Sequence, residues 1–227
     1  MLYIIGTPIG NLEDLSYRQA KYLSLAEIIL TEDTRSTGML LQRSEQLFSF
    51  KRVPDQRLFS YYKENEFEKL PQIIEWLQEE KELVLISQAG MPLISDPGYF
   101  LVKTIIKQSI PFIVIPGPTA ATTALIYSGF NPQEHMFLGF LPKKHSDILK
   151  VFEKIKQIKM VFPDISFIFY ESPLRIKETL KLLDVSMPTS HICICRELTK
   201  KFEEILRGTP NQLIEKTYKG ELTVVLS

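Results

Sequence analysis

Hydrophobic residues in the first 130 positions alternate between short continuous runs and patterns of helical period. Runs of four to six residues at 2–6, 27–30, 82–87 and 112–115 are rich in Val, Ile and Leu, which is typical of strands buried on both faces. The intervals at 16–26, 37–47, 71–80 and 99–108 have helical spacing, and 48–66 lacks a clean period and is expected to hold one short strand. This alternation predicts a mostly parallel α/β sheet.

Local signals refine three of these helices. Ser16 to Gln19 resembles a capping box at a helix start, and Pro71 is suited to a first helical turn. Within 99–108, helical spacing places Val102, Ile105 and Ile106 on one buried face.

The pattern changes after Phe130. Five short strands are expected at 135–141, 166–172, 191–197, 203–208 and 221–227, with only three helical intervals between them. The third and fourth are too close for a helical crossover, so they predict a hairpin and antiparallel pairing. We therefore expect two α/β lobes, a mostly parallel N-terminal lobe over 1–130 and a C-terminal lobe with a mixed sheet over 131–227.

Glycine- and proline-rich loops follow three of the first four strands. They occupy 6–11, 87–99 ("SQAGMPLISDPGY") and 116–119. Glycine lets the backbone approach a ligand closely and proline fixes the turn. Because ligands of open α/β sheets bind outside the carboxyl ends of the strands, the three loops predict one binding site at that edge.

Charge is balanced over the whole chain, with 27 basic and 27 acidic residues, but unevenly distributed. Residues 1–142 carry 12 basic and 16 acidic side chains, and residues 143–227 carry 15 and 11. The basic second part is suited to a polyanion. The start "MLYIIGTPIG" has no basic segment typical of a signal peptide, and no apolar run approaches the ~20 residues of a membrane span. A cytoplasmic location is expected.

Several classes of site are not supported. Cys193 and Cys195 point to one face of a strand, which suits small buried side chains, and the three histidines have no ligand spacing, so no metal is expected. The glycine motifs of dinucleotide-binding folds and P-loops, and the serine motif of α/β hydrolases, are absent.

Motifs spread in order over nearly the whole chain then identify a family. They are "TPIGNLED" at 7–14, "EDTR" at 32–35, "ISDPGY" at 94–99, "PGPTA" at 116–120, "GFLPKK" at 139–144, "FYESPLR" at 169–175, "RELTK" at 196–200, "RGT" at 207–209 and "KGELTVV" at 219–225. Together they resemble the ribosomal RNA small subunit methyltransferase I family, a branch of the tetrapyrrole methylase superfamily.

The resemblance implies a two-lobed tetrapyrrole-methylase-like fold that binds S-adenosylmethionine in the cleft between the lobes, as a homodimer. It implies methyl transfer to the ribose 2′-oxygen of a cytidine in 16S rRNA of the small ribosomal subunit. The loop at 87–99 resembles the one that cradles the methionine end of the donor. The residues implied for donor binding are Pro8, Ser87, Gln88, Ala89, Gly90, Ile94, Ser95, Pro116, Gly117, Thr119, Ala120, Phe140, Leu141, Tyr170, Glu197, Leu198, Thr199 and Glu221.

Chemistry adds roles to some residues. Adenine needs a narrow apolar slot, for which Phe140, Leu141, Tyr170 and Leu198 are candidates. A ribose hydroxyl is a poor nucleophile, so a base or an in-line geometry is required.

Charged residues of two motifs are the catalytic candidates, and which one is the base stays open. The plainer interpretation of "EDTR" is a paired loop that starts a helix, and that of Glu171 is a structural cap. The catalytic candidates are Glu171, Glu32 and Arg35, with Asp33 and Arg175 as further candidates, and those for RNA are Arg35, Lys143, Lys144 and Arg175.

The chain departs from the family pattern at named positions. Gln88 replaces the aspartate of the S-D-A-G loop, Met91 a threonine, and Leu174 the histidine of "ESPHR". The helical C-terminal extension of longer members is also absent from this sequence. Two alternatives therefore remain: a small-molecule methylase of the tetrapyrrole or corrinoid type, and a donor-binding paralogue with reduced activity.

Overall fold

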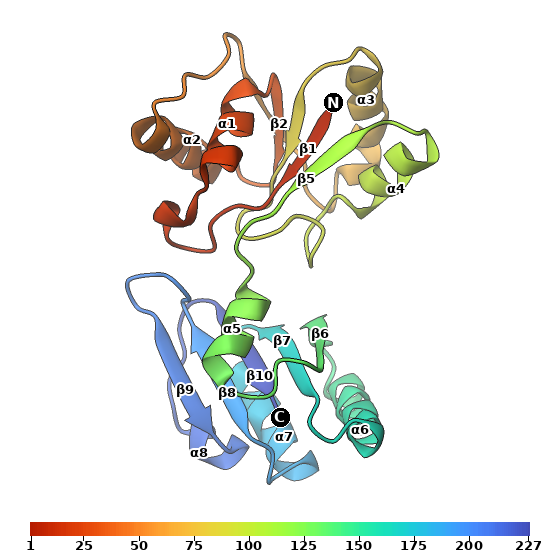
Figure 1. Cartoon of the computed structure of the whole chain (residues 1–227). Coiled ribbons are helices and arrows are strands. Elements are labelled where there is room, and N and C mark those ends of the chain that lie inside the picture. Colours follow the sequence, from red (N-terminus) through yellow and green to blue (C-terminus); the bar gives the residue numbers. More distant parts are fainter. The chain divides into compact units, whose positions relative to one another are not determined.

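The computed structural model describes all residues from Met1 to Ser227 as two compact units, Met1–Thr119 and Ala120–Ser227 (Figure 1). The boundary lies earlier than the expected one after residue 130, because helix α5 (Ala120–Ser128) packs on the second sheet. Cys195 Sγ in that sheet lies 4.0 Å from the carbonyl oxygen of Ala124. Gly129, with a φ of +73°, ends the helix.

The first unit is built on a five-stranded sheet in which every pair is parallel, as predicted. The strand order is β3-β2-β4-β1-β5. The strands are β1 (Leu2–Ile5), β2 (Ile28–Thr31), β3 (Arg57–Ser60), β4 (Leu83–Leu85) and β5 (Phe112–Ile115). The helices are η1 (Leu12–Asp14), α1 (Tyr17–Leu25), α2 (Thr34–Phe48), α3 (Glu66–Gln78) and α4 (Tyr99–Lys107).

Helices cover both faces of this sheet (Figure 1). One face packs on α1 and α2 through a core that includes Ile5, Leu23 and Leu41. The other packs on α3 and α4 through a core that includes Ile73 and Leu101. Burial on both faces explains why the strand sequences are continuously apolar.

Two local predictions were wrong. Helix α3 begins at Glu66, so Pro71 lies inside it rather than in its first turn. The start is earlier because the side chain of Asn65 accepts from Tyr62 N and closes the preceding turn at 2.8 Å. In α4, Ile105 is buried and half-buried Val102 packs against the same core, as predicted, but Ile106 is 60% exposed and Leu101 completes the buried face in its place.

The second unit contains the predicted mixed sheet, in the order β6-β7-β10-β8-β9. Only β6 and β7 are parallel, and β8 and β9 form the expected antiparallel hairpin. The strands are β6 (His135–Phe140), β7 (Ser166–Glu171), β8 (Ile192–Arg196), β9 (Glu204–Gly208) and β10 (Leu222–Leu226). The helices besides α5 are α6 (His145–Val161), α7 (Ile176–Ser186) and α8 (Pro210–Ile214).

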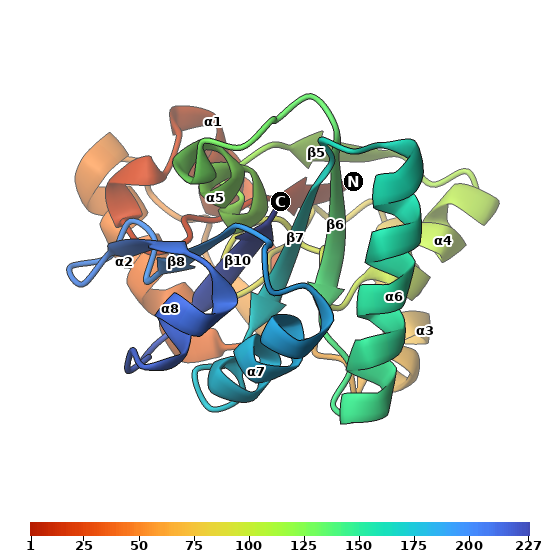
Figure 2. The same cartoon turned by 90° about the horizontal axis from the view of Figure 1, so that it is seen from below.

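Helices α6, α7 and α8 cover one face of the second sheet, with Phe152, Leu180 and Leu213 in one core (Figure 2). Cys193 and Cys195 point to the opposite face, beneath α5, and are buried and unbridged. No helix combines the length and apolar composition that crossing a membrane requires.

Candidate functional site

The carboxyl-end loops of the first unit are joined to one another, as the sequence predicts. Thr7, after β1, and Gly90, after β4, exchange two backbone hydrogen bonds of 2.8 and 3.1 Å. The Thr7 hydroxyl also donates to the carbonyl of Ser87 at 3.3 Å. Gly6 N donates to Ile115 O, at the end of β5, at 3.0 Å. The loops after β1, β4 and β5 therefore form one continuous structure.

Glycine is required where two of these loops meet. A β-carbon on Gly117 would lie 2.7 Å from the carbonyl carbon of Gly6. The side chain of Gln19, which is almost fully buried, donates to the carbonyls of Gly6 and Pro116 at 2.8 and 3.0 Å. The sequence identified Gln19 only as part of the capping box, which is also present.

The loop after β4 has a strained backbone. Leu93 and Ser95 have φ values of +70° and +73°, and Gly98 has +118°. Left-handed conformations of non-glycine residues are costly and gather at functional sites. Buried Glu66 accepts from Gly98 N at 3.1 Å and so fixes the end of the loop to the start of α3.

Two carboxyl groups interact at this edge, Glu32 after β2 and Asp96 in the strained loop. Burial raises the pKa of Asp96 to about 7, with a further rise from Glu32 and an opposing hydrogen bond from Ser87. Burial also raises the pKa of Glu32, against a hydrogen bond from the backbone of Gln88, and Glu64 raises it further. A carboxyl group with a pKa near neutrality is a candidate general base.

The rest of "EDTR" begins a helix. Asp33 is the N-cap of α2, and its Oδ1 accepts from Arg35 N at 2.8 Å and from Ser36 N at 3.4 Å. The plainer interpretation of Asp33 is therefore the correct one. Arg35 is exposed beside it, and no contact in the structure assigns it a role.

In the second unit, the candidate residues gather at one edge of the sheet. Strands β7 and β8 both run antiparallel to β10, and β6 runs parallel to β7. The carboxyl ends of β6, β7 and β8 therefore lie at the same edge. Leu222, at the start of β10, pairs with both Glu171 and Arg196, which places Glu221 there too.

Glu171 is a structural acid rather than an accessible base. Its side chain is fully buried, and its Oε2 accepts from the Thr179 hydroxyl at 2.8 Å. Its Oε1 accepts from Ser172 N at 2.8 Å and lies 3.3 Å from Arg175 Nε. Oε2 also accepts from Arg175 Nη2 at 3.3 Å, so each oxygen has two donors, and the buried carboxylate is not placed to take a proton from a substrate.

Arg175 is likewise engaged within the protein. Its Nη2 donates to the carbonyls of Leu141 and Pro142 at 3.1 and 2.6 Å. This contact fixes the segment that leads to Lys143 and Lys144, which are exposed at the start of α6. Of the side chains predicted to bind RNA here, the two lysines are accessible, and Arg175 positions them.

Only part of the expected apolar slot is accessible. Phe140 is 60% exposed and its ring centroid lies 5.4 Å from that of half-buried Tyr170. Leu141 and Leu198 are buried, the former in the core of the second unit. A flat ligand at this edge would meet the two aromatic rings, and the two leucines only support it.

The loop after β8 is strained in the same way as the loop after β4. Glu197 and Thr199 have φ values of +49° and +63°. The Glu197 carboxylate accepts from Glu221 N at 2.8 Å and from Lys200 at 3.2 Å, and the Glu221 backbone lowers its pKa, as does Lys200. The predicted residues Glu197, Thr199 and Glu221 are thus neighbours.

The remaining donor candidates lie in the joined loops or next to them. Pro8, Ser87 and Gly90 are buried, whereas Gln88, Ala89, Ile94, Ser95 and Pro116 are exposed, and Gly117, Thr119 and Ala120 are half-buried. Sequence reasoning missed Asp96, although it lies inside the quoted loop. The signal available was an acid one residue before the Pro-Gly turn.

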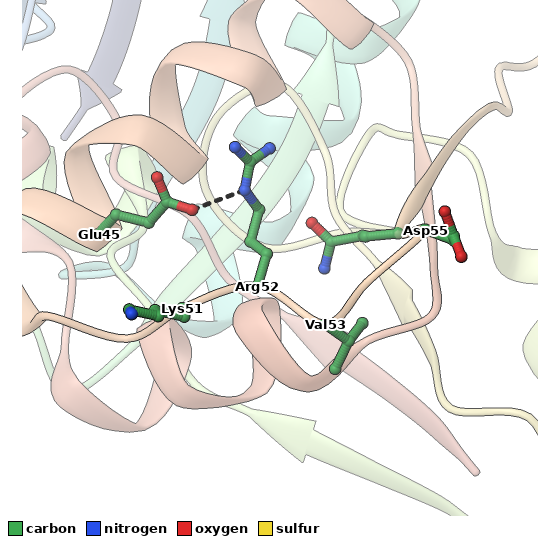
Figure 3. Close-up of a pocket in the computed structure, with 6 residues that line it drawn as sticks. Glu45, Lys51, Arg52, Val53 and Asp55 are labelled. Carbon is green, nitrogen blue, oxygen red and sulfur yellow. Dashed lines mark hydrogen bonds and ion pairs between the residues drawn. The ribbon is translucent and has the colours of Figure 1, made fainter.

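A pocket elsewhere in the first unit is not a candidate site. It has a volume of about 420 Å³ and is lined by Glu45, Lys51, Arg52, Val53, Asp55 and Gln56 (Figure 3). Arg52 Nε lies 2.7 Å from Glu45 Oε1. Glu45 lies near the end of α2 and the other residues lie in the loop before β3, so they belong to the amino edge of the parallel sheet, opposite the joined loops.

Comparison with known proteins identifies the class first. Residues 1–214 match the sequence profile of the Tetrapyrrole (Corrin/Porphyrin) Methylases. Two solved structures share the fold: a diphthine synthase (TM-score 0.70, 15% identity, 100% of this chain and 89% of that chain) and the uroporphyrin-III-C-methyltransferase of Thermus thermophilus (TM-score 0.63, 17% identity, 99% and 93%).

Relatives of higher identity then narrow the class. The chain is 41% identical over 229 residues to the ribosomal RNA small subunit methyltransferase I of Halalkalibacterium halodurans, covering 99% of this chain and 75% of the relative. It is 39% identical over 233 residues to the protein of the same name from Hydrogenobaculum sp., covering 100% and 95%. The chain belongs to the tetrapyrrole methylases and, within them, to the ribosomal RNA small subunit methyltransferase I family. No group of His, Cys, Asp or Glu side chains is arranged to hold a metal ion.

Proposed function

We propose that the chain transfers a methyl group from S-adenosylmethionine to the ribose 2′-oxygen of a cytidine in 16S rRNA of the small ribosomal subunit, in the cytoplasm. The observation that carries the proposal is the 41% identity over 99% of the chain to a small-subunit rRNA methyltransferase. The joined loops of the first unit and the strained edge of the second support it.

The residues present fit S-adenosylmethionine. The donor supplies an electrophilic methyl group on a positively charged sulfonium, and it carries a zwitterionic tail. Glu32 and Asp96 provide half-buried carboxyl groups near the loop after β4. In that loop there is space beside Gly90, where an added β-carbon would meet no atom nearer than 3.5 Å. Phe140 and Tyr170 provide aromatic faces for a planar base. We propose that the donor binds at the joined loops of the first unit and at the carboxyl edge of the second sheet.

In this proposal, Glu32 or Asp96 is the base that removes the proton from the ribose hydroxyl. Glu171 does not have this role, because it is buried and paired with Arg175. Lys143 and Lys144 are the proposed phosphate contacts at the second edge, with Arg35 in the first unit. A homodimer, as in the family, is part of the same proposal.

The direct test is methylation of small subunits that lack this modification. Purified protein, such subunits and isotopically labelled donor are incubated, and the rRNA nucleosides are analysed by mass spectrometry. We expect labelled 2′-O-methylcytidine from a single position. Label on a base, or on another nucleoside, would refute the proposal.

Parallel reactions distinguish the alternatives. Uroporphyrinogen and corrinoid precursors replace the subunits in one arm, and methyl transfer to them would identify a small-molecule methylase. Calorimetric titration with donor forms the other arm. Donor binding without any transfer to subunits would identify a paralogue of reduced activity, in line with Gln88.

A further inference from the structure

The hairpin between β8 and β9 extends from the second sheet at the edge that holds the candidate residues (Figures 1 and 2). At its tip, Phe202 is 63% exposed. Lys201 Nζ lies 5.7 Å from the centroid of the Phe202 ring, and Lys201 forms none of the ion pairs of the chain. The tip therefore presents a cation without an ion-pair partner beside an exposed aromatic ring.

The hairpin holds this tip in a fixed conformation. Glu197 and Thr199 adopt left-handed backbone conformations. Thr199 N donates to a carboxylate oxygen of Glu203 at 2.6 Å, and Arg196 Nη1 donates to the carbonyl of Phe202 at 3.3 Å. A rigid loop loses little conformational entropy when it binds.

The acidic side chains around the tip are engaged in contacts inside the unit. Each carboxylate of the hairpin and of the adjoining strand start has a partner. Glu197 and Glu221 pair with Lys200, Glu204 pairs with Arg196, and Glu203 accepts from Thr199 N and from the Tyr127 hydroxyl at 3.0 Å. Lys201 is the cation at the tip that no carboxylate pairs, and its ammonium is available to a ligand phosphate.

We infer that the Lys201–Phe202 tip contacts the RNA substrate, with the Phe202 ring stacked on an unpaired base and the Lys201 ammonium paired with a phosphate. Single-stranded RNA is bound by this combination of aromatic faces and cations. The inference rests on the proposed function for the identity of the RNA, and it adds a contact that is independent of Lys143 and Lys144.

The strand order places the two proposed RNA contacts, the lysine pair Lys143 and Lys144 and the Lys201–Phe202 tip, along one edge of the second sheet. Strands β6 and β8 both end at this edge and are three strand spacings apart, about 14 Å. A strand of RNA that crosses the edge from Lys143 to the hairpin therefore meets cations at both ends and the exposed Phe140 ring near the first.

The test measures binding to purified bacterial small ribosomal subunits without donor. We expect Phe202→Ala to weaken binding about tenfold and Phe202→Trp to retain it, because any large aromatic face can stack. Phe162→Ala is the matched control, since Phe162 is 46% exposed at the end of α6, at the opposite edge. Lys201→Glu should weaken binding and lower the slope of log affinity against log salt concentration by about 0.7. Lys154→Glu makes the same charge change at an exposed position of α6 and should alter neither the affinity nor this slope.

Donor titration, thermal unfolding and measurement of the oligomeric state distinguish the possible outcomes. Donor titration and thermal unfolding of each variant show whether folding and the donor site are intact. Wild-type affinity for Phe202→Ala would overturn the inference, and so would conversion of a dimer to a monomer, because the tip would then face a second copy. If neither the wild type nor the variants methylate the subunits, but Phe202→Ala binds them more weakly than the wild type does, then the proposed function fails and the RNA contact stands.

Discussion

The backbones of Gly6 and Gly117 lie against each other, so that a β-carbon on Gly6 would stand 2.7 Å from Gly117 Cα. It would also meet the sulfur of Met91. These contacts join the loops after β1 and β5 without space for a side chain. Since backbone atoms cannot move aside as a flexible side chain can, the junction depends on glycine.

Gly6→Ala should therefore destabilise the chain by about 1–3 kcal/mol, the usual cost of overpacking, and weaken donor binding. Gly38→Ala is the control, because an added β-carbon at Gly38 in α2 would meet nothing within 4 Å. That variant should gain up to about 1 kcal/mol from helix propensity. Thermal unfolding checks both, and equal melting temperatures for the two variants would contradict the role of the junction.

Gln88→Asp should tighten donor binding about tenfold. Gln88 is exposed and its backbone N–H donates to Glu32, so its side chain is free to change. A hydrogen bond to a charged acceptor is worth about 1.5–3 kcal/mol against about 1 for a neutral one. Calorimetric titration measures the difference, and equal dissociation constants would show that only the backbone of this loop meets the donor.

Asp96 makes stability depend on pH in a defined window. Its pKa of about 7 lies above the ordinary value of 3.8, so the unfolded chain ionises this group at lower pH than the folded one. Stability should fall as pH rises from about 4 to 7, and the cost is complete above 7. The same direction holds for Glu32, whose pKa is also raised.

Asp96→Asn removes this cost, so its melting temperature should be above that of the wild type at pH 8 but not at pH 4. The expected rise is about 2–4 °C for each kcal/mol of cost removed. Asp55→Asn, in an exposed loop, is the control and should show no such trend. Calorimetric scans at several pH values provide the measurement. A difference in melting temperature that stays constant from pH 4 to pH 8 would exclude Asp96 as its source.

Arg175→Met should destabilise the second unit by roughly 3 kcal/mol, because it leaves the buried Glu171 carboxylate without its cation. The double variant Glu171→Gln, Arg175→Met removes both charges and should lose less than the sum of the single changes. Thermal unfolding of the three proteins tests this. Strict additivity would mean that the pair does not act as a unit.

The sequence predicted the strands of the first sheet and their mostly parallel pairing because a strand buried on both faces has a continuously apolar sequence, as at 83–85. The hairpin of β8 and β9 followed from its short connection alone. The membership of α5 in the second unit was not predicted, since it depends on contacts with β8 and β10 that no local pattern encodes.

Side-chain roles were harder to predict, because they depend on what lies nearby in space. Glu171 and Arg175 stand four residues apart in a motif, and only the fold shows that each neutralises the other. Asp96 and Glu32 are distant in sequence, and burial raises the pKa of both; Glu32 raises that of Asp96 further, and Glu64 that of Glu32. Gln19 joins two loops that only the sheet brings together.

The place of β1 in the sheet has a consequence for synthesis. Its partners are β4 and β5, at residues 83–85 and 112–115. The first strand to be synthesised is therefore paired on both sides only after the last strand of its unit has been made, whereas β2 and β3 can pair earlier. At about 5–20 residues per second, that interval is on the order of 5–20 s. A nascent chain that stalls before Ile115 presents an apolar strand with open edges, which a chaperone has to cover until translation resumes.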